Sequence, residues 1–437
     1  MAFEHVNAIE VSLFGKRVGV VAAEPGVRDS YAFEYYPKWI EHGFSISPLL
    51  LPLAPGAQVF RSYSKDTWLG LPPPIADALP DHFGNSLINA HLSQQGITSA
   101  EITPLDRLAY VASRSIGALE FRPAYSVARV AGGILDIAEL VTAARDAIQG
   151  NLTDDRESKR ALQNLLSVGV SAGGARAKAV VNVDPKTGAL TAGHKQEAGK
   201  ESWLIKFDGV MRDSTLGQSE QYGRIEYAYS LMAHDAKIAM PQTRLLEEND
   251  RAHFMIRRFD RLDTPPGSTG KAFQKLHLQS LCAMDGIDFN LVHTNEYASL
   301  FAVIDRLGLH GEAKTEAFRR MAFNFFAANC DDHSKNFSFL MDHGGVWHLA
   351  PAYDMTFAHN SQNKWLKEHL MGLDAKFSGV SSQDLSRFAD THQIPYARQV
   401  LKSIKAVVAN WPDYAKQAGV SAEASRHIAK TLAELKT

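Results

Sequence analysis

The chain contains little cysteine, little net charge and no long hydrophobic run. It has 437 residues, a formal charge of −2 and two cysteines, Cys282 and Cys330. Neither cysteine has a partner at metal-binding or redox spacing, which argues against a disulfide framework and favours a reducing cytoplasmic setting. No window is apolar over the length of a bilayer, and the first residues lack a signal-peptide core, so we expect no membrane association. The low net charge removes the global signature of a nucleic-acid-binding protein.

The chain has an ordinary globular composition with three differently patterned parts. Hydrophobic residues make up 45% and charged residues 22% of it, and its length allows two or three domains. Residues 1–115 predict a small mixed α/β subdomain, with a hairpin over residues 9–22 and a helix over residues 84–96. Residues 116–261 predict a strand-rich part, and residues 262–437 a mainly helical part. We therefore expect an α+β fold.

The strand-rich part carries a glycine turn and a lysine on a strand. The segment SAGGARAK at 171–178 predicts a glycine-rich turn that enters a strand. The segment ESWLIKFD at 201–208 predicts a strand that carries Lys206. The segment after it predicts a helix that carries Glu226 and ends at Pro241.

An apolar helix leads into the most informative stretch, AANCDDHSKNFSFLMDHGGVWHLAPAYDM at 327–355. One face of the helix predicted over 315–329 is formed by Phe318, Met321, Ala322, Phe325 and Phe326. Two short strands, FSFL and VWHLA, are joined by DHGG and return the chain to Asp354. The remainder predicts mostly helix.

Transfer of the γ-phosphoryl group of ATP needs a small set of groups. Mg²⁺ takes hard oxygen ligands, often a carboxylate and an amide oxygen. A separate carboxylate orients the acceptor hydroxyl and takes its proton. A lysine steadies the α- and β-phosphates, and a glycine-rich turn lets backbone N–H groups approach the triphosphate.

The sequence supplies these parts in the order that a protein-kinase-like fold uses. Lys206 is the candidate phosphate contact, and Glu226 on the following helix is its candidate partner. Asp331 is the candidate base, and Asn336 follows at the Asp-to-Asn interval of the kinase catalytic loop. Asp354 then takes the place of a second metal ligand.

Each of these residues also has a structural interpretation. A Gly-Gly turn before a strand is commonly only a turn. Lys206 is also typical of a solvated strand edge, and Glu226 of an exposed helix face. Asp331 and Asp332 are also typical of a loop that follows a helix, and His333 is typical of a histidine that packs within a loop. No single residue indicates phosphoryl transfer by itself. The order and spacing of Lys206, Asp331, Asn336 and Asp354 together favour it.

The motifs that carry this order resemble the HipA family of bacterial serine/threonine kinases, the toxins of type II toxin–antitoxin pairs. They are LPDHFGN (79–85), GALEFRP (117–123), SAGGARAK (171–178), WLIKFD (203–208), RFDR (258–261), NCDDHSKNFSFL (329–340) and LAPAYDM (349–355). The resemblance spans nearly the whole chain. It implies a protein-kinase-like bilobal fold, with an extra N-terminal α/β subdomain, a β-rich N-lobe and a mainly helical C-lobe.

The resemblance implies a site for ATP and Mg²⁺. Asp331 would be the catalytic base, Asn336 and Asp354 would hold Mg²⁺, and Lys206 would hold the α- and β-phosphates. The other residues implied to line the nucleotide, with 257–259 as the adenine hinge, are Gly173, Gly174, Ala175, Arg176, Ala177, Lys178, Arg257, Arg258, Phe259, His333, Ser334, Lys335 and Tyr353.

Ser171 matches the serine that family members autophosphorylate, and Ser167 is a second candidate. A phosphate on Ser171 would add about −1.5 to −2 charges at neutral pH to the loop that covers the triphosphate. Like-charge repulsion would then oppose ATP binding. The structural interpretation of Ser171 is a turn serine.

The resemblance also implies partners. Family members phosphorylate aminoacyl-tRNA synthetases and are held by a small helix-turn-helix antitoxin that binds operator DNA. We expect a HipB-like antitoxin, a protein substrate of that class, and DNA contact mainly through the antitoxin. Three features depart from the family. Arg257 stands where members often have glutamate, and the segment KLHLQSLC (275–282) lacks an acidic residue that members often have there. The basic cluster after the catalytic part offers mainly Lys376.

Two other functions stay open. One is a kinase-fold corepressor in an antitoxin–DNA complex with dispensable catalysis, which the intact set of Lys206, Asp331, Asn336 and Asp354 disfavours. The other is a small-molecule kinase of the aminoglycoside type, which the N-terminal part (1–115) and the HipA-type motifs disfavour.

Overall fold

The computed structural model describes most of the chain. The described residues are 3–41, 43–125, 135–149, 162–166, 168, 176–193, 197–208, 221–248, 251–263 and 273–435. They fall into two compact units. Unit 1 comprises Met1–Met211, Met255–Gln279 and Leu340–Val346, and unit 2 comprises Arg212–Phe254, Ser280–Phe339 and Trp347–Thr437. The division into 1–115, 116–261 and 262–437 stays a prediction.

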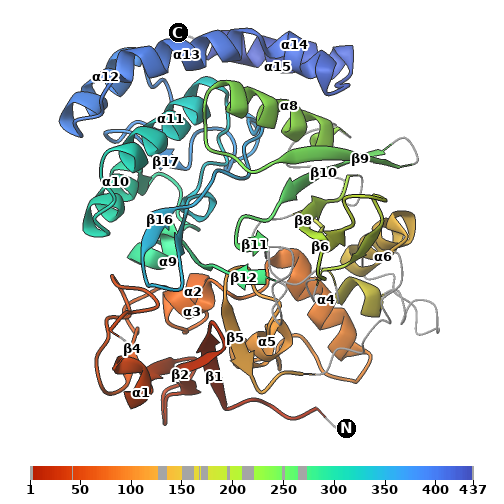
Figure 1. Cartoon of the computed structure of the whole chain (residues 1–437), viewed down its shortest axis with the longest axis vertical. Coiled ribbons are helices and arrows are strands. Elements are labelled where there is room, and N and C mark those ends of the chain that lie inside the picture. The colour runs from red at the N-terminus through yellow and green to blue at the C-terminus, as the bar shows by residue number, and fades with distance from the viewer. Residues whose placement is uncertain are drawn as a thin grey trace. The chain divides into compact units, whose positions relative to one another are not determined.

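Unit 1 begins with a five-stranded antiparallel sheet in the order β4-β3-β2-β1-β5 (Figure 1). Its strands are β1 (Ala8–Leu13), β2 (Lys16–Ala23), β3 (Tyr31–Tyr35), β4 (Gln58–Val59) and β5 (Leu119–Arg122). The hairpin predicted over residues 9–22 is confirmed, and its turn places Phe14 and Gly15 at positive φ. The motif GALEFRP forms β5, which pairs with β1.

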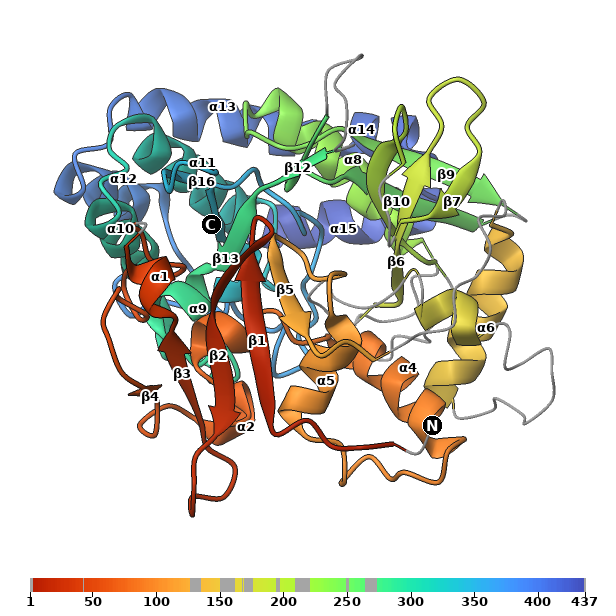
Figure 2. The ribbon, with the colours of Figure 1, turned by 60° about the horizontal axis from the view of Figure 1, so that its bottom comes forward.

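Helices lie between β3 and β5 in the chain, one of them before β4 and the others after it. They are α1 (Pro37–Ile40), α2 (Lys65–Trp68), α3 (Pro73–Ala76), α4 (His82–Ser93) and α5 (Pro104–Val111). The side chain of Asp81 caps α4 by accepting the Gly84 N–H at 2.7 Å, and a capping box of Thr103 and Asp106 begins α5. Helix α5 lies beside the sheet, against β1 and β5 (Figure 2). Helix α4 begins at His82, two positions before its predicted start at 84.

A second sheet of unit 1 holds the predicted lysine strand. Its five strands run in the order β7-β6-β8-β10-β9, and they are β6 (Lys178–Val183), β7 (Leu190–Ala192), β8 (Glu201–Lys206), β9 (Thr243–Glu248) and β10 (Arg251–Arg257). Helix α6 (Ile137–Gln149) precedes them. The antiparallel register of β6 and β8 places Lys178 directly opposite Lys206. The boundary between the units falls within β10.

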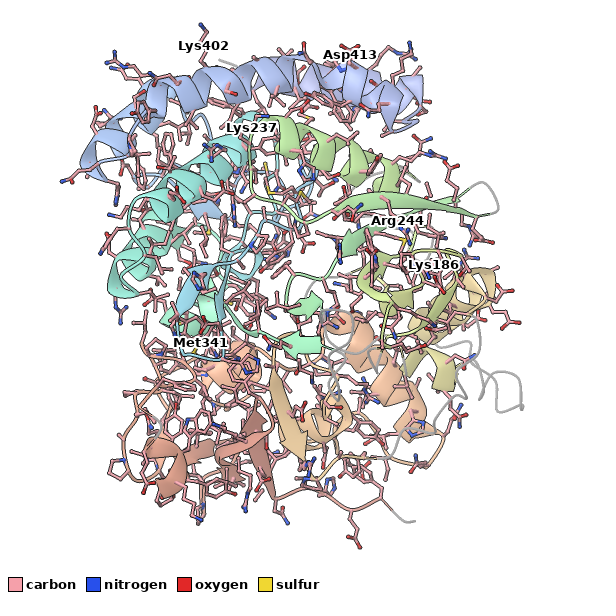
Figure 3. All side chains as sticks on the ribbon, in the orientation of Figure 1. Lys186, Lys237, Arg244, Met341, Lys402 and Asp413 are labelled. Atoms are coloured by element: carbon pink, nitrogen blue, oxygen red, sulfur yellow. The ribbon has the colours of Figure 1, made fainter. Side chains whose placement is uncertain are left out.

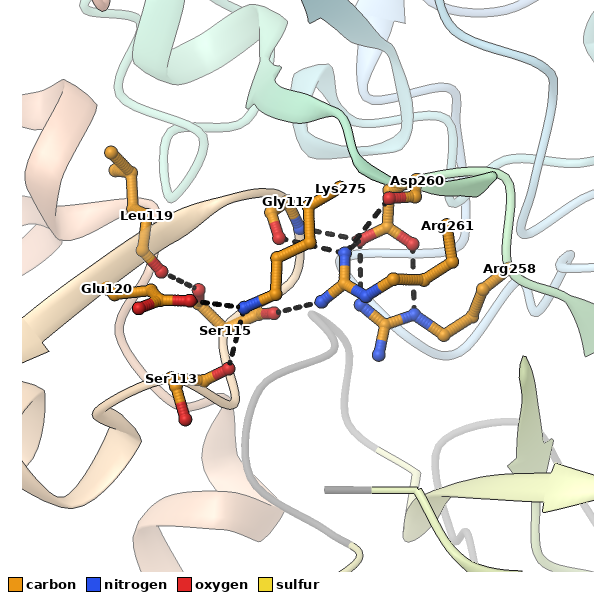
Figure 4. Close-up of polar contacts among 9 residues, drawn as sticks. All are labelled: Ser113, Ser115, Gly117, Leu119, Glu120, Arg258, Asp260, Arg261 and Lys275. Atoms are coloured by element: carbon orange, nitrogen blue, oxygen red, sulfur yellow. Dashed lines mark hydrogen bonds and ion pairs between the residues drawn. The ribbon is translucent and has the colours of Figure 1, made fainter. Parts of the chain in front are cut away.

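A buried carboxylate joins the segment after β10 to the loop before β5 (Figure 4). Asp260 accepts hydrogen bonds from Arg258 Nη2 (2.7 Å), Arg261 Nη1 (2.7 Å) and the Gly117 N–H (2.6 Å). Arg261 also donates to the carbonyls of Gly117 (2.9 Å) and Ser115 (3.2 Å). Although burial opposes ionisation, Arg258 and Arg261 hold the pKa of Asp260 well below its usual range. The RFDR motif therefore has a structural role in this fold.

The same contact extends through a lysine of the next strand pair. Strands β11 (Arg261–Asp263) and β12 (Phe273–Lys275) form a two-stranded ladder. Lys275 at its end donates to Glu120 Oε1 at 2.7 Å and to the Ser113 carbonyl at 3.3 Å. Strand β13 (His277–Ser280) follows, so the described chain is not yet helical at residue 262, where the sequence predicted the helical part to begin.

Unit 2 is mainly helical. Its helices are α8 (Tyr222–Asp235), α9 (Leu281–Asp285), α10 (Tyr297–Arg306), α11 (Glu312–Phe326), α12 (Ser382–Thr391), α13 (Ala397–Ala409), α14 (Trp411–Gln417) and α15 (Ala422–Glu434). Its short strands include β9 (Thr243–Glu248), β14 (Asn295–Glu296), β16 (Trp347–Leu349) and β17 (Met371–Gly372). Tyr229 lies in its core, with its ring 5.4 Å from that of Trp411 and 6.1 Å from that of Phe323, measured between centroids. No helix in the described ranges combines the length and the apolar character needed to cross a bilayer.

One sequence expectation about unit 2 is wrong, and a second, mostly helical structure after Asp354, holds only from Ser382 onwards. Helix α8 ends at Asp235 and not at Pro241, because Lys237 (labelled in Figure 3) takes a positive φ of 63°. The N–H groups of Lys237 and Ile238 bond back to the carbonyls of His234 (3.0 Å) and Ala233 (2.9 Å), which is a Schellman ending.

The segment after Asp354 is also not helical until Ser382. Within it, the side chains of Asn360 and Asn363 accept the N–H groups two residues ahead, at 2.9 Å in both cases. Such local bonds compete with helix formation. Asp374 and Ala375 take positive φ, which also interrupts a helix.

The hairpin predicted between Phe337 and Leu349 is confirmed as β15 (Ser338–Met341) and β16. Its tip belongs to unit 1 and packs against the N-terminal sheet. The ring of His343 stacks on that of Phe14 with 4.0 Å between centroids. Gly345 has a φ of 82°, and a Cβ there would lie 3.0 Å from the ring of Phe44, so only glycine fits.

The Asp260 cluster gives a first testable prediction. Asp260→Asn should lower the free energy of unfolding by about 3–5 kcal/mol, because it leaves two buried guanidinium groups without their carboxylate. Urea unfolding measures the change. The exposed Asp29, near Arg28 at 3.4 Å, is a matched control whose asparagine variant should stay within about 0.5 kcal/mol of the parent. Equal effects of the two substitutions would contradict the role of Asp260.

Candidate active site

The C-terminal end of α11 delivers the candidate catalytic loop. The Ala327 carbonyl accepts the hydroxyl of the buried Tyr229 at 2.7 Å, which fixes the last turn of the helix. Ala328 then takes a positive φ of 54°, and the Asn329 N–H bonds back to the Asn324 carbonyl at 3.0 Å. This reversal turns the chain out of the helix immediately before Asp331.

Backbone pairing brings the segment after Asp354 beside this loop. The Cys330 N–H donates to the Ala358 carbonyl at 3.0 Å, and the Ala358 N–H donates to the Ala328 carbonyl at 3.0 Å. Asn329 and Ala358 form a parallel bridge. The loop that carries Asp331 and the segment that carries Asp354 are therefore neighbours within unit 2.

The structure brings Asp331 and Asn336 together. The Asp331 side chain is 48% exposed, and its Oδ1 lies 3.6 Å from His333 Nε2. Residues Ser334–Asn336 form the 3₁₀ turn η1, which places Asn336 Nδ2 2.8 Å from the Asp331 carbonyl. Because the amide nitrogen makes this bond, Oδ1 of Asn336 is the atom left for a hard cation.

Side chains also hold Asp354 against the loop. The Tyr353 hydroxyl donates to the Lys335 carbonyl at 2.7 Å and bonds to Ser338. Asn329 Nδ2 lies 3.4 Å from the Asp354 carbonyl. Asp354 itself has a φ of 54°, a strained backbone region that aspartate tolerates and that is common at functional sites.

Asp332 is an anchoring residue that the sequence analysis did not assign. Its side chain is fully buried, and its carboxylate accepts from Tyr297 Oη (2.7 Å), His369 Nδ1 (2.9 Å), Leu370 N (2.8 Å) and Met371 N (3.4 Å). It therefore ties the candidate catalytic loop to residues 369–371. The sequence gives only the pair Asp331-Asp332, in which nothing distinguishes an exposed base from a buried anchor.

Buried amides connect this anchor to Asp354. The Tyr297 hydroxyl accepts from Asn324 Nδ2 at 2.9 Å, and Asn324 Oδ1 accepts from Asn329 Nδ2 at 2.9 Å. Asn329 in turn reaches the Asp354 carbonyl. The signal in the sequence was Asn324, a polar residue within the apolar helix α11, where it is 2% exposed.

The remaining loop residues fit a bound polar ligand. Among the described residues, His333 Nδ1 and Ser334 Oγ are buried atoms without a hydrogen-bond partner, and such atoms call for a ligand, ion or water. Lys335 Nζ lies 4.7 Å from the ring centroid of Phe289. No group of three or more His, Cys, Asp and Glu side chains suited to a metal occurs among the described residues. Asn336 and Asp354 instead provide the one amide and one carboxylate that suit Mg²⁺ bound together with phosphates.

Unit 1 holds most of the other predicted residues. Lys206, at the end of β8, is 8% exposed and Lys178 is 4% exposed. Lys178 Nζ forms an ion pair with Asp81 Oδ2 at 3.1 Å. Arg176 and Ala177 lead into β6. Ser167, Ser171, Gly173, Gly174 and Ala175 lie outside the described residues.

Glu226 is fully buried in α8 of unit 2. The convergence of Lys206 with Glu226, Asp331, Asn336 and Asp354 stays a prediction.

The predicted hinge residues have structural contacts of their own. The Arg258 N–H donates to the Ser202 carbonyl at 2.9 Å as part of the sheet, and the Arg258 side chain belongs to the Asp260 cluster. Arg257 Nη1 lies 3.4 Å from Glu201 Oε1. The role of residues 257–259 as an adenine hinge stays a prediction.

The Asp332–His369 pair predicts a pH dependence of stability. Burial alone would lower the pKa of His369, but Cys330 and Asp332 raise it to about 10 from an ordinary value of 6.5. Because the folded-state pKa is the higher one, the pair stabilises fully below pH 6.5, and this contribution is lost as pH rises towards 10.

His369→Gln should therefore cost about 3–5 kcal/mol at pH 6, and the cost should shrink towards pH 10. Urea unfolding across this range measures it. His293→Gln is a matched control, since His293 is 51% exposed beside Glu368. A cost of His369→Gln that does not change with pH would contradict the ion pair.

Comparisons with known proteins agree with this architecture. A family model described as the HipA-like C-terminal domain matches residues 170–434, and one described as the HipA N-terminal domain matches residues 9–122. A search of curated proteins found no match.

Among solved structures, HipA of Shewanella oneidensis MR-1, in a complex with HipB and operator DNA, is similar over 98% of this chain and 96% of that one, with 16% identity and a TM-score of 0.65. The proinflammatory kinase CtkA of Helicobacter pylori matches 52% of this chain and 92% of its own, with 11% identity and a TM-score of 0.29. The likeness to the HipA structure confirms the expected α+β, HipA-like fold. With both HipA domains matched across most of its length, the chain belongs to the HipA family.

Proposed function

We propose that this chain is an ATP-dependent serine/threonine-protein kinase. The observation that carries the proposal is the arrangement of Asp331, Asn336 and Asp354 in unit 2: an exposed carboxylate, an amide bonded to its backbone, and a second acid held beside the same loop. This is the set of groups that phosphoryl transfer needs around its acceptor and its metal.

In the proposed reaction, Asp331 orients the serine hydroxyl of a protein substrate and takes its proton as the oxygen attacks the γ-phosphorus of ATP. The bond from the γ-phosphorus to the bridging oxygen breaks, and the products are phosphoserine and ADP. Asn336 Oδ1 and the Asp354 carboxylate would hold Mg²⁺, which neutralises phosphate charge when bound. Lys206 holds the α- and β-phosphates. His333, beside Asp331, and Lys335 would approach the nucleotide.

The biological setting follows from the family and stays part of the proposal. The solved HipA is described in a complex with HipB and operator DNA, and we infer a HipB-like antitoxin as the partner of this chain. The proposed substrate is a component of translation such as an aminoacyl-tRNA synthetase. The chain would then act as a toxin. A corepressor without catalysis would share the partner but would not need the base.

Removal of the base tests the kinase. Asp331→Ala should lower the rate of phosphate transfer from labelled ATP to proteins of a bacterial lysate by about 100- to 10,000-fold. Asp390→Ala is a matched control, because Asp390 is an exposed carboxylate on α12. Expression of each variant in growing bacteria adds a second measurement. Equal growth arrest by wild type and Asp331→Ala would show that catalysis is not the toxic activity.

We further propose that Ser171 is an autophosphorylation site that switches the enzyme off. Ser171→Ala should keep nucleotide binding and stay active longer, since no phosphate can accumulate in the glycine-rich loop to repel ATP. Phosphopeptide mapping after incubation with ATP and Mg²⁺ measures the modification. If mapping finds no phosphate on Ser171 or on Ser167, the switch is refuted. The kinase assay is unaffected by this result.

A further inference from the structure

Two buried lysines face each other in the sheet of unit 1. Lys178 on β6 and Lys206 on β8 are direct partners in the antiparallel register and are 4% and 8% exposed. Directly opposed residues share one face of a sheet, with their Cβ atoms about 4.5–5.5 Å apart. Their ammonium groups therefore reach overlapping space, and like charges so placed repel each other, more strongly when buried.

The N-terminal subdomain supplies a counter-charge to one of these lysines. Asp81 Oδ2 lies 3.1 Å from Lys178 Nζ, and each side chain is 5% exposed. The other carboxylate oxygen, Oδ1, accepts the Gly84 N–H at 2.7 Å and so caps helix α4. A carboxylate at the start of a helix is also favoured by the helix dipole. The position of Asp81 is therefore set by the N-terminal subdomain.

Helix α4 is in turn tied to its neighbour α5. Arg107 on α5 donates to Asn85 Oδ1 at 2.8 Å and to Asn89 Oδ1 at 3.1 Å, both on α4. Burial lowers the pKa of Arg107, yet its guanidinium remains charged at neutral pH. These bonds fix the start of α4, and Asp81 with it.

We propose that Asp81 is a positioning residue for the kinase reaction: it holds the Lys178 ammonium aside and balances its charge, so that Lys206 alone sets the position of the triphosphate. This inference rests on the proposed function. It gives the N-terminal HipA domain a defined part in ATP use, through one carboxylate. It also separates the roles of the two lysines, which the sequence placed together at the nucleotide.

The expected consequence is an unusual kinetic change. Without the Asp81 charge, Lys178 is released beside Lys206 and attracts the same phosphates. ATP binding should become roughly three- to tenfold tighter, since the site gains positive charge, while kcat falls about tenfold because the triphosphate is misplaced. A merely structural defect would weaken ATP binding.

Four full-length proteins test this: wild type, Asp81→Asn, Lys178→Met and the double variant. Asparagine caps a helix about as well as aspartate, so Asp81→Asn removes the charge and keeps the cap. The measurements are the Kd of a non-hydrolysable ATP analogue with Mg²⁺ by calorimetry, and kcat with labelled ATP. The double variant should recover kcat to within about threefold of wild type, because the competing ammonium is gone. Thr103→Ala, which removes the cap of α5, is the matched control and should lower stability without tightening ATP binding.

The outcomes separate the two proposals. Weaker ATP binding by Asp81→Asn, or no recovery of kcat in the double variant, would overturn the role of Asp81 and leave the kinase intact. A folded wild type that neither binds the ATP analogue nor transfers phosphate would overturn the proposed function, and the positioning role with it.

Discussion

The buried carboxylate of Asp332 is the interaction on which the candidate site most depends. A fully buried charge is tolerable only when its hydrogen bonds are made, and Asp332 accepts four of them, from a tyrosine, a histidine and two backbone N–H groups. The same residue lies in the loop that carries Asp331 and Asn336. The proposed base, Asp331, is therefore held in place by a neighbour that is fully buried.

Buried carboxylates play similar parts elsewhere in the chain. Asp260 binds two arginines and the Gly117 N–H, and Asp106 accepts the Val6 N–H at 2.9 Å and the Tyr125 hydroxyl at 3.0 Å. Each joins segments that are distant in sequence. Truncating one partner of such a cluster leaves a charge without compensation, so these positions tolerate little change. The fold thus uses charge to connect pieces that short apolar strands alone would hold loosely.

The sequence predicted the elements that local patterns determine. The hairpin of β1 and β2, the strand of Lys206, the helix α11 and the hairpin after Asn336 follow from alternation, helical spacing and turn residues, and the family motifs predicted the fold. Local patterns failed where a single backbone state decided the outcome. Nothing in the sequence marks Lys237 as the residue that ends α8, and the chain after Asp354 is fixed by Asn side chains and by Asp332.

For the candidate site, spacing predicted Asp331, Asn336 and Asp354, and the structure places their segments together in unit 2. Sequence spacing could not identify Asp332, Tyr297, Asn324 or His369, because their roles arise from contacts between elements far apart in the chain. The pairing of Lys178 with Asp81 was hidden for the same reason, since 97 residues separate them (178 minus 81).

These contacts bear on where the polypeptide can be divided. A catalytic fragment that starts after Arg122 would lack Asp81, the Gly117 N–H, the Ser115 carbonyl and the Phe14 ring. Lys178 would lose the Asp81 carboxylate, Arg261 would keep Asp260 but lose two backbone acceptors, and the tip of the β15–β16 hairpin would be left uncovered. Excision of the N-terminal HipA domain would therefore damage the remainder, even though the residues proposed for catalysis all lie beyond it.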